Sequence, residues 1–337
     1  MMAPLVRVEN LRKYFHVRGG WFGLRRGRVH AVDGVSFEIA AGETLGLVGE
    51  SGCGKSTLAR CVARLAEPDS GRLEIGGEDV THRASRDLKP LRRDVQLIFQ
   101  DPYASLNPRK RIRQIIGEAL HLRLGRIDRL KREAEIAALL KRVGLPVQFM
   151  DSMPRDLSGG QRQRVGIARA LAAGPKLIVA DEPVSALDVS VQADILNLLK
   201  DLQDELGLTV MFISHDLGVI RHVSNRVGVM YLGRLVEIAP ADAFYEAPLH
   251  PYSEALLLAI PIPDPDARLA RKEIVLEGDV PNPITPPPGC RFHTRCVYAQ
   301  DVCGKVEPEL AGHGDGRFVA CHFPLHRAPA LQPPAAG

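Results

Sequence analysis

The chain has 337 residues, of which 45% are hydrophobic and 25% are charged, values typical of a globular protein with one large domain or two smaller ones. Its 44 Lys and Arg against 40 Asp and Glu leave a formal charge of +4, too small to favour a protein that coats nucleic acid. No apolar run approaches the roughly 18 to 20 residues that a membrane helix needs, and the sequence opens with no charged-then-apolar leader. We therefore expect a cytosolic chain that reaches a membrane only through a partner.

Cysteines and prolines are unevenly distributed. Sixteen of the 25 prolines follow residue 239, and four of the six cysteines lie near the end, at Cys290, Cys296, Cys303 and Cys321. This shift in composition predicts a long regular domain over 1–238, a proline-punctuated extension over 239–330 and a disordered tail over 331–337.

In chain order, the apolar pattern predicts strands that alternate with helices. The predicted strands are 6–10, 32–39, 44–48, 95–99, 177–180, 209–213 and 227–231, and helices are predicted from residue 55 and over 161–172, 190–206 and 216–223. Such alternation indicates an α/β fold with a mostly parallel sheet covered by helices. Between 101 and 157 only helices are predicted, at 112–122 and 129–143, so we expect a helical insertion. We interpret 16–30 as a solvated hairpin loop, with a docking surface for a neighbour as the alternative.

Residues 49–57 match the GxxxxGK[ST] pattern of a phosphate-binding loop, in the required place between a strand and a helix. Glycines let consecutive backbone amides turn inward around phosphate oxygens, and the helix N-terminus adds its dipole. Lys55 supplies a positive charge to the outer phosphates, and the Ser56 hydroxyl can ligate Mg²⁺. We therefore expect a nucleotide to contact Gly49, Glu50, Ser51, Gly52, Cys53, Gly54, Lys55, Ser56 and Thr57.

The apolar strand over 177–180 ends in two carboxylates, Asp181 and Glu182. Beside a phosphate loop, Asp181 would hold Mg²⁺ through water, and Glu182 could polarise a water for in-line attack on a γ-phosphate. A strand that merely ends in two solvated acids is common in isolation. Together with the intact loop, the two acids indicate the second half of a hydrolytic site.

Residues 157–164, Leu-Ser-Gly-Gly-Gln-Arg-Gln-Arg, resemble the signature motif of the ATP-binding-cassette (ABC) ATPases. The serine and the glycine amides form an anion-binding turn at the start of a helix. The resemblance implies a RecA-like P-loop NTPase with an antiparallel β subdomain, a helical insertion and a Cys-rich C-terminal extension. It also implies that two cassettes close around two ATP molecules, with the γ-phosphate held by one cassette facing these residues of the other: Ser158, Gly159, Gly160 and Gln161.

Further positions match the cassette pattern residue by residue. Gln100 resembles the glutamine that contacts Mg²⁺ and the attacking water and moves with the transmembrane partner. Residues 185–188, Ser-Ala-Leu-Asp, resemble the loop that touches the opposite subunit, with Asp188 as its last residue. His215 resembles the histidine that bonds the γ-phosphate. Phe15 aligns with the aromatic residue that stacks on adenine, with Tyr14 as the adjacent alternative. The implied catalytic residues are Glu182, His215, Gln100 and Lys55, and the implied Mg²⁺ ligands are Ser56, Gln100 and Asp181.

Three longer segments, 98–108, 250–257 and 286–296, resemble the ATPase subunits of oligopeptide, dipeptide and nickel importers, although Thr294 stands where these often have proline. The resemblance covers about 6–323. It implies an ATP-hydrolysing subunit that powers peptide uptake from the cytoplasmic face of the cytoplasmic membrane, with nickel or another small solute as the alternative cargo. The implied partners are a second ABC ATPase subunit, either a paralogue or a second copy, two permease subunits and, indirectly, an extracytoplasmic peptide-binding protein; nucleic acid is not an expected partner.

The four late cysteines are separated by five, six and seventeen residues, unlike the short paired spacings of most zinc ribbons. Disulfides are not expected in a reducing cytosol, and four thiolates around one centre suit an iron–sulfur cluster or a structural Zn²⁺. The resemblance to importer subunits with a four-iron four-sulfur (4Fe–4S) cluster at this motif favours the cluster.

Two other classes of function stay open from the sequence. One is a soluble cassette ATPase acting on nucleic acid or ribosomes, which the single cassette and the absence of a strong basic patch disfavour. The other is a redox protein that carries a cluster and also binds ATP.

Overall fold

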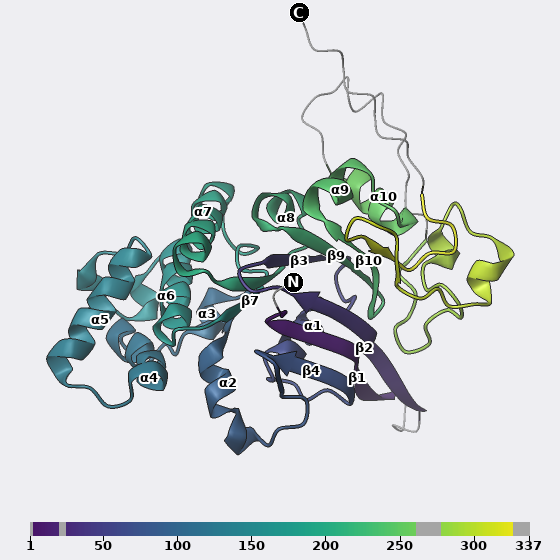
Figure 1. Cartoon of the computed structure of the whole chain (residues 1–337). Helices are drawn as coiled ribbons and strands as arrows, with labels where there is room; N and C mark the ends of the chain where they lie inside the picture. The colour runs from purple at the N-terminus through teal and green to yellow at the C-terminus, as the bar shows by residue number, and fades with distance from the viewer. Residues whose placement is uncertain (1–2, 20–24, 261–277, 326–337) are drawn as a thin grey trace, which may run out of the picture.

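The computed structural model describes residues 3–19, 25–260 and 278–325, and an eight-stranded sheet forms their centre (Figure 1). Its strand order is β11-β12-β10-β9-β3-β8-β7-β6, with β9, β3, β8, β7 and β6 parallel and the others antiparallel. The strands are β3 (Thr44–Val48), β6 (Val95–Ile98), β7 (Leu177–Asp181), β8 (Thr209–Ile213), β9 (Arg226–Tyr231), β10 (Arg234–Pro240), β11 (Ala311–Gly312) and β12 (Phe318–Val319). The prediction of a mostly parallel sheet is confirmed.

Both faces of the central sheet are buried, which explains why its strands read as continuous apolar runs. In β7, Leu177 and Val179 pack in one hydrophobic cluster, whereas Ile178 and Ala180 pack in a second cluster on the other face. Side chains of successive strand residues point to opposite faces, so the four apolar residues of this strand are shared between the two cores.

A four-stranded antiparallel sheet, ordered β2-β1-β4-β5, covers one face of the central sheet (Figure 1). Its strands are β1 (Val6–Gly19), β2 (Arg25–Ile39), β4 (Ser70–Ile75) and β5 (Glu78–Asp79). The interpretation of 16–30 as a loop is wrong for its described residues, because β1 and β2 stay paired out to Gly19 and Arg25. Cross-strand partners such as Phe15 and Val29 extend the ladder there, and such pairs stabilise strands where local composition alone suggests a loop.

Helices flank the sheets, some of them at chain positions expected from the sequence. The helices outside the helical arm are α1 (Lys55–Val62), α2 (Lys89–Asp94), α7 (Val189–Leu206), α8 (Leu217–Val223), α9 (Ala241–Glu246) and α10 (Pro251–Leu258). The sequence analysis did not predict α2, α9 or α10, nor strands β4, β5, β10, β11 and β12. Within the described residues, no helix combines the length and the apolar character needed to cross a lipid bilayer.

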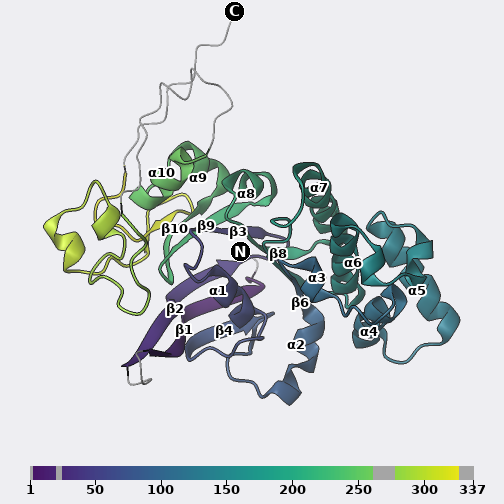
Figure 2. The same cartoon turned by 180° about the vertical axis from the view of Figure 1, so that it is seen from behind.

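A helical arm extends from the edge of the central sheet that ends in β6 (Figures 1 and 2). It contains α3 (Pro102–Ser105), α4 (Ile112–Leu124), α5 (Arg129–Arg142) and α6 (Gly159–Ala172). The helices α4 and α5 correspond to the two that the sequence predicts within 101–157. Because α3 begins two residues after Gln100, the arm is joined directly to a candidate catalytic residue.

The C-terminal segment 278–325 lies beside β10, at the end of the molecule opposite the helical arm (Figures 1 and 2). It is attached through the β10–β12 pairing and through hydrogen bonds from Ala320 N to Val236 O and from Leu325 N to Leu249 O, both 2.8 Å. The predicted end of the first domain, residue 238, falls inside β10. The predicted disordered tail, 331–337, lies outside the described residues.

Candidate functional site: a nucleotide-hydrolysing centre

The phosphate loop connects β3 to α1, and two of its glycines are required by close contacts. Gly49 has φ +148° and Gly54 has φ +109°, and a Cβ would lie 2.1 Å from Met230 O at the first and 1.9 Å from Ala31 O at the second. A side chain at either position would collide with backbone that cannot move aside. The loop is therefore packed against the residues of β9 and β2, and only glycine lets it follow this path.

Polar groups of the loop are bonded to one another and to β7. Lys55 is buried, and its Nζ donates to Gly49 O at 2.7 Å and to Glu50 O at 3.0 Å. The hydroxyl of Ser56 donates to Asp181 Oδ1 at 2.9 Å. Burial raises the pKa of Asp181, and the Ser56 hydrogen bond acts in the opposite direction. A buried carboxylate beside a hydroxyl oxygen is a donor set that suits Mg²⁺.

Three candidate catalytic side chains meet at a single carboxylate oxygen. Gln100 Nε2 donates to Glu182 Oε2 at 2.9 Å, and His215 Nδ1 lies 3.3 Å from the same oxygen. Gln100 follows β6, Glu182 follows β7 and His215 follows β8, so the carboxyl ends of three neighbouring parallel strands bring them together. Ligands of open α/β sheets bind at this edge.

The backbone of Glu182 itself is unusual. Its φ of +47° lies in the left-handed region, which costs a non-glycine residue free energy and is typical of functional sites. The conformation is held by hydrogen bonds from Glu182 N to Ile213 O at 3.0 Å and from Ser185 Oγ to Glu182 O at 3.1 Å. The carboxylate is thereby held at the carboxyl end of β7. It does not continue the alternation of the β7 side chains between the two faces of the sheet.

The signature turn forms a capping box at the start of α6. Gln161 N donates to Ser158 Oγ at 3.3 Å, and Ser158 N donates to Gln161 Oε1 at 2.9 Å. A Cβ at Gly160 would lie 2.5 Å from Val191 Cγ1, so glycine allows the turn to pack against the first turn of α7. The exposed Asp188 caps α7 by accepting from Val191 N at 3.0 Å, and this bond lowers the pKa of Asp188.

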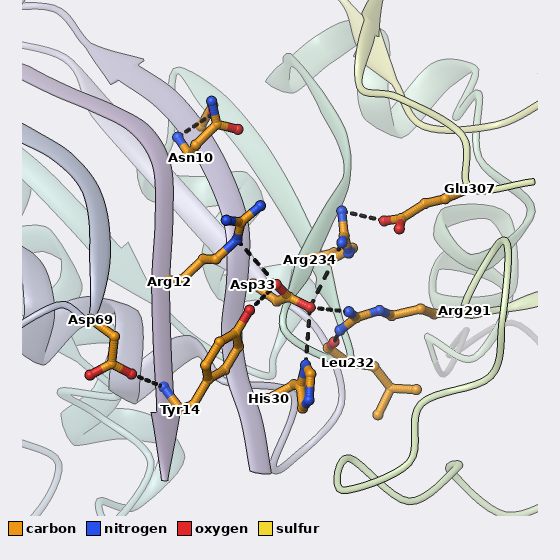
Figure 3. A network of polar contacts seen from close by, with 11 residues as sticks. Asn10, Arg12, Tyr14, His30, Asp33, Asp69, Leu232, Arg234, Arg291 and Glu307 are labelled. Atoms are coloured by element: carbon orange, nitrogen blue, oxygen red, sulfur yellow. Dashed lines mark hydrogen bonds and ion pairs between the residues drawn. The ribbon is translucent and has the colours of Figure 1, made fainter. Parts of the chain in front are cut away.

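Phe15 and Tyr14 lie next to each other in β1 but have different environments. The side chain of Phe15 is 43% exposed, with Lys13 Nζ 5.7 Å from its ring centroid. Tyr14 is tied into a polar network by a 2.6 Å hydrogen bond from its hydroxyl to Asp33 (Figure 3). Its ring also contacts that of His30, with centroids 4.6 Å apart. Phe15 is exposed and Tyr14 is partly buried, so Phe15 is the more accessible of the two rings for stacking on a base.

Comparison with known proteins agrees with this geometry. Residues 32–185 match the family model described as ABC transporter, and residues 236–303 match the model described as oligopeptide/dipeptide transporter, C-terminal region. The chain is 53% identical to the probable peptide ABC transporter ATP-binding protein y4tS of Sinorhizobium fredii, over 98% of this chain and 92% of that protein. The chain belongs to the ABC transporter family.

Further relatives of this ABC protein extend the comparison. The oligopeptide transport ATP-binding protein AppF of Bacillus subtilis is 49% identical over 95% of this chain and 97% of its own length. Among solved structures, the ATP-binding cassette MJ0796 bound to ADP and Pi is 30% identical, with a TM-score of 0.63 over 70% of this chain and 98% of that chain. The ABC cassette fold predicted from the sequence is therefore confirmed.

The four late cysteines of this ABC protein line one small cavity, together with His250, His293 and Phe292. All four are free thiols, and burial raises the pKa of Cys296 and of Cys321 to about 11. In the described part of the chain, no three Cys, His, Asp or Glu side chains are grouped closely enough to hold a metal ion as they stand. The donor set is right for a soft metal centre, but the thiols would have to draw closer around it.

Two contacts of the cassette were not predicted from the sequence, and both join the C-terminal part of the chain to Glu50 in the phosphate loop. Arg295 forms a bidentate pair with the Glu50 carboxylate, with distances of 2.8 and 3.1 Å. The hydroxyl of Tyr252 accepts from Glu50 N at 2.9 Å. Both residues lie in segments that resemble importer subunits, which was the available signal, but nothing in the local pattern indicates their partner.

Proposed function

We propose that this chain is the ATP-hydrolysing subunit of an ABC importer that powers uptake of dipeptides and oligopeptides through partner permease subunits. The observation that carries the catalytic part is the convergence of Gln100 and His215 on the Glu182 carboxylate, beside the phosphate loop. The peptide cargo is supported by two relatives, 53% and 49% identical to this chain, that are named as peptide and oligopeptide transport ATP-binding proteins.

In the proposed mechanism, each polar group of the site has one task. Lys55 leaves the two loop carbonyls and binds the outer phosphates of ATP. Glu182 acts as the general base that takes a proton from the attacking water, while Gln100 orients that water and His215 donates to the γ-phosphate.

Mg²⁺ would be held by Ser56, Asp181 and Gln100. When bound, it neutralises charge that develops on the phosphates. The hydrogen bond between Ser56 and Asp181 already brings two of these oxygen donors to 2.9 Å from each other.

The signature residues Ser158 to Gln161 complete the ATP site of a second cassette, and the Asp188 loop contacts that cassette. Asp188 and its neighbour Val189, which is 82% exposed, present a protruding surface for such a contact. The second cassette is a paralogue or another copy of this chain. The helical arm that begins after Gln100 receives cytoplasmic helices of the permease, which two partner subunits form in the cytoplasmic membrane. A peptide-binding protein acts indirectly.

The division of labour along the chain follows the same proposal. Residues 1–238 form the ATPase domain, and 239–330 form the extension of the oligopeptide-transporter type, which carries Cys290, Cys296, Cys303 and Cys321. These thiols would hold a 4Fe–4S cluster, with a structural Zn²⁺ as the alternative. A centre of this kind stabilises a segment that has little regular secondary structure of its own.

The metal proposal can be tested by composition. The full chain is purified under anaerobic conditions, and its iron, sulfide and zinc contents are measured, alongside a Cys303→Ser variant. Stoichiometric iron and sulfide that are lost in the variant support the cluster, and zinc supports the alternative. Cys61→Ser, which removes a buried thiol of α1 outside the cavity, should keep the metal. Absence of both metals from the wild-type chain would contradict the proposal.

The function itself is tested by uptake of labelled di- to hexapeptides, with nickel in parallel, in cells that carry this chain or its Glu182→Gln variant. We expect the variant to bind ATP, to hydrolyse it about 10² to 10⁴ times more slowly and to lose peptide uptake. Glu205→Gln, at an exposed site of α7, serves as the matched control and should support normal uptake. Unchanged peptide uptake with reduced nickel uptake would overturn the cargo, and normal ATP turnover in the Glu182 variant would overturn the assignment of the base.

A further inference from the structure

The segment between Cys290 and Cys296 reaches back to the nucleotide-binding face of the cassette. Arg295 within it pairs with both oxygens of the Glu50 carboxylate, at 2.8 and 3.1 Å. The Arg295 side chain is only 7% exposed, and that of Glu50 is 24% exposed. A bidentate, largely desolvated pair of this kind is stronger and more directional than an ion pair at the surface.

Glu50 is held in the phosphate loop from three directions. Its side chain is bound by Arg295, its backbone nitrogen donates to Tyr252 Oη at 2.9 Å, and its carbonyl accepts from Lys55 Nζ at 3.0 Å. Two of these three partners come from beyond residue 250, outside the ATPase domain. The shape of the phosphate loop therefore depends on side chains that the C-terminal part of the chain supplies.

An aromatic cluster holds Tyr252 and Arg295, the two C-terminal partners of Glu50, in place. Tyr231 contacts Tyr252 and Phe292 with ring centroids 4.7 and 5.3 Å apart, and Tyr252 contacts Phe292 at 5.3 Å. All three rings are fully buried or nearly so, and Arg295 Nη1 also lies 3.5 Å from Tyr231 Oη. Side chains locked in this way lose little further entropy when they act on a ligand site.

The charge of Glu50 makes its position important. A carboxylate in a loop that surrounds polyphosphate repels the ligand, and the repulsion grows where water is excluded. The guanidinium of Arg295 neutralises this charge and holds the carboxylate on the side of the extension. Without that pairing, a negative group would be free to turn toward the phosphates.

We propose that Arg295 is a positioning residue for ATP binding, supplied to the phosphate loop by the cysteine-bearing extension. This inference rests on the proposed function, because it needs the loop to bind ATP. Arg295 does not touch the nucleotide; it acts through Glu50, and its contribution is to ATP affinity more than to the chemical step.

The test is steady-state ATPase kinetics of the full chain. We expect Arg295→Ala to raise the KM for ATP about tenfold, equivalent to about 1.4 kcal/mol, with kcat at saturating ATP within about twofold. Arg295→Lys should recover part of the affinity for ATP, because lysine keeps the positive charge but cannot form the bidentate pair. The double variant Arg295→Ala with Glu50→Gln should recover most of it, because no unpaired carboxylate is left.

Arg317→Ala is the matched control. Arg317 is another partly buried arginine of the extension, but its guanidinium lies 3.7 Å from the carboxylate of Glu237, away from the phosphate loop. This variant should leave the KM for ATP unchanged even if it loosens the extension. An equal rise in KM for both arginine variants would overturn the proposal in favour of a general packing role.

Three further outcomes separate the possibilities. An unchanged KM in Arg295→Ala, or a double variant as weak as the single one, overturns the role of Arg295. If Arg295→Ala does not fold, Arg295→Lys decides: a KM above the wild-type value at unchanged kcat supports the positioning role, and an unchanged KM overturns it. A wild-type chain that neither binds nor hydrolyses ATP would instead refute the proposed function.

Discussion

Replacement of Asp33 by asparagine should lower the free energy of unfolding by about 3 kcal/mol. The Asp33 side chain is 8% exposed, and its carboxylate accepts from Tyr14 Oη at 2.6 Å and lies 3.2 Å from His30 Nδ1 (Figure 3). It also pairs with Arg291, a side chain that is equally buried. Asparagine keeps the shape of the side chain and can still accept from Tyr14, but it offers no charge to Arg291.

The magnitude follows from what the substitution leaves behind. Removal of one partner of a buried ion pair costs about 3–5 kcal/mol, because the remaining charge is buried without compensation. Arg291 keeps a hydrogen bond to Leu232 O, which places the cost at the lower end of that range. Arg12 and Arg234 lie 3.5 and 3.7 Å from the carboxylate and are more exposed, so their loss adds at most about 1 kcal/mol each.

The effect has a defined pH dependence. Burial alone would raise the pKa of Asp33, but hydrogen bonds from Tyr14, His30 and Arg291 outweigh it and hold the pKa well below the ordinary value of 3.8. A carboxyl whose pKa is depressed by folding contributes its full stabilisation above its pKa in the unfolded chain and loses it as the pH falls. The difference between wild type and variant should therefore be constant from about pH 8 to about pH 5 and should shrink below about pH 4.

Urea unfolding followed by circular dichroism at several pH values measures both quantities. Asp87→Asn, at an exposed site whose carboxylate lies 3.7 Å from Arg86, should change the free energy of unfolding by no more than about 0.5 kcal/mol. A loss below about 1 kcal/mol in the Asp33 variant would refute the ion-pair argument. A difference that stays the same below pH 4 would show that the charge of Asp33 is not its cause.

Three other substitutions test separate parts of the structure. Burial lowers the pKa of His250 to about 3, so only the unfolded chain takes up a proton there between about pH 6 and 4. In wild type this makes the free energy of unfolding fall as the pH falls. His250→Asn should reduce that slope, measured by urea unfolding, by about 1.4 kcal/mol per pH unit. Gly54→Ala places a Cβ 1.9 Å from Ala31 O, whereas Gly52→Ala meets nothing within 4 Å; the first should be less stable by about 2 kcal/mol or more in thermal unfolding, and equal stabilities would contradict the packing argument. Phe15→Ala should raise the KM for ATP about tenfold at unchanged stability, and an unchanged KM would return the adenine contact to the neighbouring tyrosine.

The phosphate loop and the carboxylates could be predicted from the sequence because their chemistry lies in contiguous residues. Once the strands are known to be parallel, their carboxyl ends must share one edge, which accounts for the meeting of Gln100, Glu182 and His215. The pair between Arg295 and Glu50 could not be predicted, because 245 positions separate the two residues. Only the folded extension brings them together.

The hairpin of β1 and β2 illustrates a different limit. Its distal part is rich in glycine, which disfavours strands, and in charged arginine, and this composition predicts a solvated loop. In the structure the register continues from Phe15 opposite Val29 to Gly19 opposite Arg25. Pairing across the hairpin outweighs local propensity here, and a single sequence contains no direct measure of such pairing.

The site's polar groups are largely bonded to one another in this arrangement. Lys55 bonds to loop carbonyls, Ser56 to Asp181, and Glu182 to Gln100. If these groups bind ATP and Mg²⁺ as proposed, each of these bonds is exchanged for one to the ligand. The net affinity for ATP then depends on how much stronger the new bonds are than the old ones. The exchange at Glu182 has the largest structural consequence, because releasing Gln100 frees the residue that leads into the helical arm. In the proposed mechanism, the bond from Gln100 to Glu182 that breaks before hydrolysis is therefore also the bond that ties the arm to the proposed base.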